Sequence, residues 1–292
     1  MLGPDVLLQE VLNGIGVGMI YFLIAVGLTL IFGIMDFVNF AHGAFYLLGA
    51  YALYALVDFT GSFWLGLLAG PLLVVALAWL LERALLRRLY QLDHMFHILL
   101  TFGLALVVGE LAIVAWGAGP RNVSPPPLLA GIASLGPLVY PDYRLFVIGL
   151  TGLVGLGIWL GLERTRWGAI IRAGTESLDM VSCLGVDIRR VFSLTFAAGA
   201  GLAGLGGVLA APMRGVNPFM GDEVLGLAFV VVVVGGMGSF AGALVAALLT
   251  GIAQSLTIAV WPLGGNIVIY VLMAAILLSR QAGLMGRRSR GG

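Results

Sequence analysis

The sequence predicts an all-α polytopic membrane protein with about 8–9 transmembrane helices. Of its 292 residues, 61% are hydrophobic and only 10% are charged, and the mean hydropathy is +1.09, which excludes an ordinary water-soluble domain. The apolar residues fall in runs close to the roughly 20 residues that a helix needs to cross the hydrocarbon core. The 44 glycines suit membrane helices, which approach closely where small residues face each other.

The apolar runs divide the chain into candidate spans. No basic residue precedes the first run, unlike in a secretory signal peptide, so we expect it to remain as a helix. The seventh run is short and forms a span of its own only if the chain turns at Gly235–Ser239. The expected spans are 11–34, 40–57, 63–82, 96–116, 145–162, 191–211, 224–238, 240–259 and 264–279.

The arginines set the expected orientation. They are Arg83, Arg87 and Arg88 after the third run; Arg164, Arg166, Arg172, Arg189 and Arg190 after the fifth; and Arg280, Arg287, Arg288 and Arg290 at the end of the chain. The positive-inside rule places these three regions in the cytoplasm and the N-terminus outside. An N-terminus outside and a C-terminus in the cytoplasm require an odd number of membrane crossings. A chain that turns at 235–239 makes nine crossings, whereas a re-entrant half-helix there leaves eight.

The segment 117–143 is expected outside. Its prolines withhold backbone donors, so we expect an irregular or polyproline-II-like cover. It could be a docking surface for an external binding protein or a plain connector.

Three polar residues lie between the first two apolar runs. Asp36, Asn39 and His42 are spaced by three, so on a helix they would share one face. Lipid offers such groups no hydrogen bonds, so this face should look inward, toward a translocation pathway. The alternative is that they cap a helix and close a turn at the membrane surface.

The same stretch resembles a known signature. Gly27-Leu-x-Leu-x-x-Gly33, then Asn39-x-Ala-His-Gly43 and Gly49-Ala-Tyr51, is similar to the signature of permease subunits of branched-chain amino-acid ABC importers. The similarity continues near Arg172 and through Val230–Gly242, so it covers most of the chain. It implies one permease domain over 1–292 with the ABC importer permease fold, for which about eight spans are usual. Asp36, Asn39, His42 and Gly43 would then shape or gate the pathway.

The segment 164–190 shows an amphipathic pattern. Its apolar positions recur at three- and four-residue steps, which predicts a helix pair at the membrane surface or against a partner; they are Trp167, Ile170, Ile171, Gly174, Leu178, Val181 and Leu184. Asp179 and Gly185 have the spacing of the Glu-Ala-Ala…Gly coupling loop of ABC importer permeases, although both alanines are replaced. The resemblance therefore implies contact with an ATPase through Arg172, Glu176, Asp179 and Gly185.

The cluster around Gly235, Gly236 and Ser239 interrupts an apolar run. An interrupted helix can aim free backbone groups at a ligand, so these residues are pathway candidates. A simple turn between spans is the other interpretation.

The resemblance implies the translocation subunit of a bacterial inner-membrane importer for branched-chain or other hydrophobic amino acids. Its partners would be a second homologous permease, two ATPase subunits and an extracytoplasmic binding protein, within membrane lipid and without nucleic acid. The chain has no lysine, so it holds no Walker A loop, and ATP would be used by the partners. We expect no cofactor or metal on this chain.

Two alternatives remain. Permeases of urea and amide ABC importers resemble the chain almost as well. A stand-alone ion-coupled secondary transporter would need intramembrane carboxylates, which Asp36 and Glu110 could supply. A membrane enzyme has less support, since no catalytic set of residues can be assigned.

Overall fold

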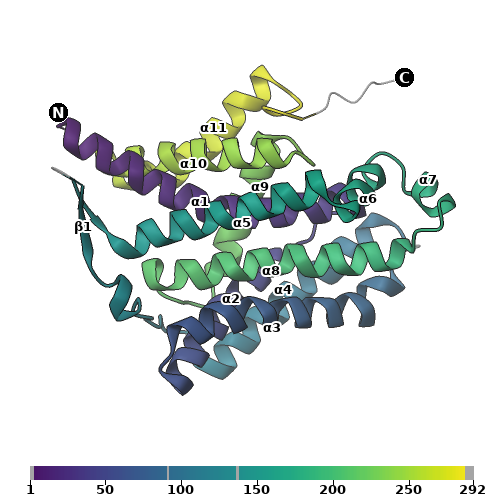
Figure 1. The fold of residues 1–292 in the computed structure, drawn as a ribbon, viewed down its shortest axis with the longest axis horizontal. Coiled ribbons are helices and arrows are strands. Elements are labelled where there is room, and N and C mark those ends of the chain that lie inside the picture. The colour runs from purple at the N-terminus through teal and green to yellow at the C-terminus, as the bar shows by residue number, and fades with distance from the viewer. Residues whose placement is uncertain (1–2, 91, 136–137, 287–292) are drawn as a thin grey trace.

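The computed structural model describes residues 3–90, 92–135 and 138–286. It is a bundle of long helices, with the N-terminus and a small hairpin at one end and two short helices at the other (Figure 1). The long helices are α1 (Pro4–Met35), α2 (His42–Thr60), α3 (Phe63–Ala84), α4 (His94–Trp116), α5 (Asp142–Arg164), α8 (Ile188–Arg214), α9 (Met220–Gly235), α10 (Phe240–Val260) and α11 (Gly265–Ser279). The shorter elements are η1 (Leu86–Arg88), η2 (Pro127–Leu129), β1 (Ile132–Leu135), β2 (Leu138–Pro141), α6 (Arg166–Gly174), α7 (Leu178–Cys183) and η3 (Pro262–Gly264).

Within the described residues, eight helices are long and apolar enough to cross a membrane. The predicted all-α polytopic class is therefore confirmed, and the chain is a multi-pass membrane protein. The described arginines of the three basic segments gather at the end that carries α6 and α7, which we call the arginine-rich end. The opposite end, with β1, β2 and η2, is the proline-rich end. Arg287, Arg288 and Arg290 lie outside the described residues.

Helix α9 is the ninth apolar helix and is short. Its 16 residues rise about 24 Å, less than the hydrocarbon core needs. Val216, just before it, pairs with Arg121 at the proline-rich end. Its last carbonyls, on Val234 and Gly235, accept the backbone N–H groups of Leu284 and Met285 at 2.8 and 3.0 Å. The turn after α11 thus caps α9 at the arginine-rich end, whereas the start of α9 is buried, with Gly221 against Gly43 of α2.

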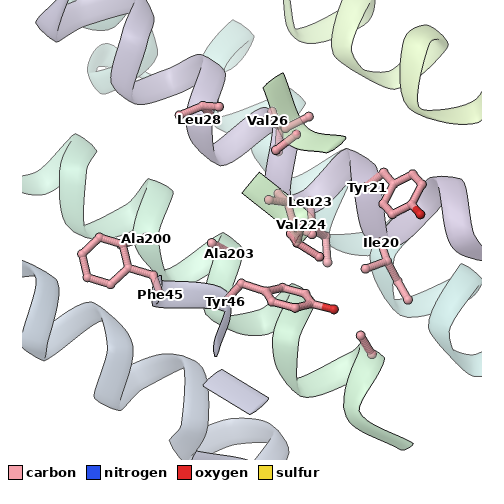
Figure 2. Close-up of a cluster of buried hydrophobic side chains, with 14 of the residues drawn as sticks. Ile20, Tyr21, Leu23, Val26, Leu28, Phe45, Tyr46, Ala200, Ala203 and Val224 are labelled. Atoms are coloured by element: carbon pink, nitrogen blue, oxygen red, sulfur yellow. The ribbon is translucent and has the colours of Figure 1, made fainter. Parts of the chain in front are cut away.

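The core surrounds α1, which packs against α5, α8, α9 and α10. Figure 2 shows side chains of α1, among them Leu23 and Val26, beside Phe45 and Tyr46 of α2 and Ala203 of α8. Helices α3 and α4 lie at the outside and expose many large apolar side chains. These are the surfaces that lipid or a membrane partner would cover.

Close helix crossings depend on glycine. A methyl group on Gly207 of α8 would overlap the carbonyl oxygen of Tyr46 in α2, and one on Gly49 would overlap that of Gly204. Small residues therefore let α2 lie directly on α8, as membrane helices do where backbones approach.

The prediction for 117–143 needs one correction. Part of the segment is not irregular, because β1 and β2 form an antiparallel hairpin in which Ala133 pairs with Tyr140. Pro125, Pro126 and Pro127 precede β1, and Pro141 is the last residue of β2, opposite Ile132. Proline is tolerated at the end of a strand, so the many prolines of the segment concealed the hairpin in the sequence pattern.

Candidate functional site

Asp36, Asn39 and His42 share no helical face. Residues 36–41 are not helical, and only His42 belongs to a helix, as the first residue of α2. Asp36 has φ 52°, and its N–H donates to the carbonyl of Phe32 at 3.0 Å, so it closes α1 in the left-handed conformation that short polar residues tolerate. The interpretation as one helical face was wrong because this cap ends the helix first. The alternative, a helix cap followed by a turn, is what the structure shows at Asp36.

The chain then turns back into the bundle. His42 Nε2 lies 2.9 Å from the carbonyl oxygen of Ile24, roughly three turns before the end of α1. Since a carbonyl only accepts, Nε2 carries the proton, which leaves Nδ1 as a buried acceptor with no partner among the described residues. Asn39 Oδ1 accepts from the N–H of Ala41 at 3.1 Å, and its Nδ2 is buried and unpartnered. Thus α2 begins inside the bundle on a polar, fully buried base.

Two signature glycines make room for this arrangement. A methyl group on Gly27 would press on the His42 ring and overlap the backbone of Gly199. Gly43 is at the start of α2, and a methyl group on it would overlap the carbonyl oxygen of Gly221 at the start of α9. The structure therefore places Gly43 at a helix crossing.

A large cavity lies at the arginine-rich end. Its volume is about 730 Å³, and it brings together residues predicted for two different roles, Asp36 and Ser239 with Arg172 and Glu176. Its lining is Phe32, Gly33, Asp36, Arg172, Ala173, Thr175, Glu176, Met237, Gly238, Ser239 and Met285. Both charge signs line it, so it can hold water and a zwitterionic solute between α1, α6 and the α9–α10 turn.

Gly235, Gly236 and Ser239 form the turn between α9 and α10. Gly236 has φ 96°, which only glycine adopts readily, and Gly235 packs on Gly242. Ser239 caps α10 by accepting the N–H of Gly242 at 3.0 Å. Of the three, Ser239 also lines the cavity.

The predicted helix pair is α6 and α7. Ile171 and Val181 are buried, as the periodicity predicts, but Leu184 is 81% exposed and Met180 is 71% exposed. Asp179 lies in the first turn of α7, and Gly185 just after it has φ 82°. An apolar patch of Met180 and Leu184 therefore projects from the arginine-rich end.

A polar cluster toward the proline-rich end was not predicted. Arg214 donates to Tyr21 Oη at 3.0 Å, and Tyr21 donates to Gln254 Oε1 at 2.7 Å. Gln254 Nε2 donates in turn to Asn266 at 3.3 Å. Arg214 stays accessible although protein surrounds it on most sides. The signal available in the sequence was an arginine just after the sixth apolar run, 191–211.

Glu82 was also missed. It is fully buried near the end of α3, where Tyr90 Oη and Ser193 Oγ both donate to its carboxylate. In the sequence it stands beside Arg83, Arg87 and Arg88 and looks like part of a solvated charged segment. The contact joins α3, the α3–α4 linker and α8.

Comparison with known proteins gives a family. Residues 10–277 match the family described as branched-chain amino acid transport system / permease component. No solved structure matches the chain.

Individual relatives match along nearly the whole chain. The high-affinity branched-chain amino acid transport system permease protein BraD of Pseudomonas aeruginosa is 30% identical, with 96% of each chain covered. The permease protein LivH of Escherichia coli K12 is similar to the same extent, 30% over 96% of each chain. The permease protein LivM of that organism is 28% identical over 82% of this chain and 61% of its own length.

Proposed function

The chain belongs to the permease components of branched-chain amino acid transport systems, and we propose that it is the translocation subunit of an ATP-driven ABC importer in a bacterial inner membrane. Its substrates would be leucine, isoleucine, valine or similar hydrophobic amino acids. The observation that carries the proposal is similarity over 96% of the chain to LivH and BraD, with no large part of either left unmatched.

The proposed mechanism is alternating access. The arginine-rich end faces the cytoplasm by the positive-inside rule, and the cavity that contains Asp36 and Arg172 is the inner vestibule of the path. Nucleotide-driven closure of the ATPases would push on α7, and α6 would pass the movement to the vestibule wall as a rigid-body shift. Asn39 and His42 would act on the path indirectly, by fixing where α2 begins.

The partners follow from the same premise. Similarity to both LivH and LivM supports pairing with a second homologous permease. One of the two ATPase subunits would dock at α7 of this chain, with Arg172, Glu176, Asp179 and Gly185 around the contact. The other would dock on the second permease, and a binding protein would dock over 117–143. ATP would be hydrolysed by the partners, because the chain contains no lysine for a phosphate loop.

Replacing Arg214 with glutamine should raise the KM of uptake about tenfold to a hundredfold, because the substrate carboxylate would lose one charge-assisted hydrogen bond. Arg214 offers donors that Tyr21 does not use, on the side from which an amino acid carboxylate would enter. Arg214→Lys keeps the charge and should lose less, and radiolabelled leucine uptake at matched expression separates the two. Equal KM values for wild type and Arg214→Gln would remove Arg214 from the path.

Purification and reconstitution test the function itself. The tagged chain, extracted in mild detergent from its native membrane, should bring an ATPase and a second permease with it. In proteoliposomes, that complex should import leucine only with ATP and binding protein. Import by the isolated chain under an ion gradient would instead establish a secondary transporter, and competition by urea or amides would establish the related importer class.

A further inference from the structure

A second cavity opens at the arginine-rich end, between α3, η1 and α8. Its volume is about 420 Å³, and it shares no lining residue with the larger cavity. The lining is Trp79, Arg83, Arg87, Asp187, Arg190, Ser193 and Leu194. Three guanidinium groups and one carboxylate thus face one hollow.

The positive charge there is mostly uncompensated. Arg190 Nε pairs with Asp187 at 3.0 Å, but in the described chain no carboxylate comes within 4.0 Å of Arg83 or Arg87. Arg83 lies 4.5 Å above the Trp79 ring. Arg87 Nε is buried without a hydrogen-bond partner among the described residues. A buried donor of this kind needs an acceptor, and none of the residues that the structure describes supplies one.

Glu82 lies at the base of this region, but it is already engaged. Tyr90 and Ser193 both donate to its carboxylate. Burial raises the pKa of Tyr90, and the hydrogen bond to Glu82 raises it further, so the phenol stays a donor at neutral pH. The arginines therefore keep donors for an external anion.

Two of the lining residues, Trp79 and Leu194, are apolar and exposed. Helix α3, which carries Trp79, also exposes Leu72, Leu73 and Leu80. Such a surface inside a membrane faces acyl chains. A ligand with an anionic head and apolar tails fits both the arginine-lined cavity and the exposed apolar side chains. An acidic protein segment fits only the cavity.

We propose that this cavity binds the phosphate group of an anionic phospholipid, whose acyl chains lie along α3. Guanidinium groups recognise phosphate through paired hydrogen bonds, and basic pockets between helices bind lipid headgroups on the cytoplasmic side. The inference uses the orientation given under the proposed function, but the binding itself does not depend on transport.

Native mass spectrometry of the purified full-length protein tests it, with 1-palmitoyl-2-oleoyl phosphatidylglycerol and the matching phosphatidylcholine as probes. The wild type should hold one phosphatidylglycerol in preference to phosphatidylcholine. The double substitution Arg83→Gln and Arg87→Gln should weaken phosphatidylglycerol binding about 30-fold, which corresponds to about 2 kcal/mol for the loss of two arginines. The double substitution Arg88→Gln and Arg189→Gln removes the same charge from residues outside the cavity lining and should change phosphatidylglycerol binding little.

Several results would overturn the proposal. One is equal binding of the two lipids, and another is an equal loss of phosphatidylglycerol binding in both double variants. A third is full competition by millimolar inorganic phosphate or glycerol 3-phosphate, which would make the cavity a site for soluble anions. Loss of a co-purifying ATPase with Arg83→Gln and Arg87→Gln, while lipid binding persists, would assign the pocket to that partner. If the glutamine pair does not fold, Arg83→Lys and Arg87→Lys should fold and bind with intermediate strength. Failure of lipid binding leaves the importer proposal intact, since co-purification and ATP-driven uptake are read separately.

Discussion

Replacing Met180 and Leu184 together with aspartate is expected to abolish ATP-dependent uptake while the protein remains folded in the membrane. The two side chains are 71% and 81% exposed, so the substitution creates no cavity and buries no charge in this chain. In the assembled importer they would fill an apolar groove of the ATPase. Buried anchors of this kind cost about 2–4 kcal/mol each when lost, so the complex should weaken by about a thousandfold or more.

The measurement is co-purification of the ATPase together with leucine uptake. Ala169→Asp with Ser182→Asp adds the same charge at exposed positions of α6 and α7 outside this pair and is the matched control. A second route to the same loss is Gly185→Arg, because φ 82° there strains any other residue and would redirect the chain after α7. Retained ATPase and normal uptake in the Met180–Leu184 variant would place the coupling contact elsewhere.

The sequence predicted the spans well because hydropathy and helix length are strong constraints in lipid. It predicted the helix pair α6–α7 for a related reason, since one face of each must be buried. Leu184 shows the limit of that reasoning. Its spacing assigned it to the buried stripe, yet α7 ends at Cys183 and leaves it exposed. Sequence periodicity is the same for an apolar side chain that is buried within the chain and for one that would be buried only against a partner protein.

The interior of the site was harder to predict. Helical spacing would put Asp36, Asn39 and His42 on one face. In the structure Asp36 itself is left-handed, ends α1 and stays exposed, whereas Asn39 and His42 beyond it are buried. Arg214 and Glu82 were missed for another reason. Each lies at the end of an apolar run, where a charge normally reaches water. Only the packing of distant helices shows that Glu82 is buried and that Arg214, although exposed, is hydrogen-bonded to Tyr21. Local pattern cannot supply such contacts.

The glycines carry the largest expected effect on folding. Gly207→Ala should prevent α2 from lying on α8, because the new methyl group would overlap the backbone carbonyl oxygen of Tyr46, an atom that no side-chain rotation can move. Overpacking costs about 1–3 kcal/mol where neighbours can adjust, and this contact between two backbones allows less adjustment. We expect loss of a monodisperse peak in detergent, or a melting temperature lowered by more than about 10 °C.

Gly149→Ala in α5 is the matched control. Apart from the backbone of its own helix, no heavy atom of the described residues lies within 4 Å of the position its methyl group would take, and alanine is the better helix former by about 1 kcal/mol. The control should therefore express and melt like the wild type or slightly better. If Gly207→Ala behaves like Gly149→Ala, then α2 and α8 do not cross at this point. Because α2 begins at His42, the buried start of α2 would then have to lie elsewhere as well, so this one substitution tests the helix crossing on which the candidate site depends.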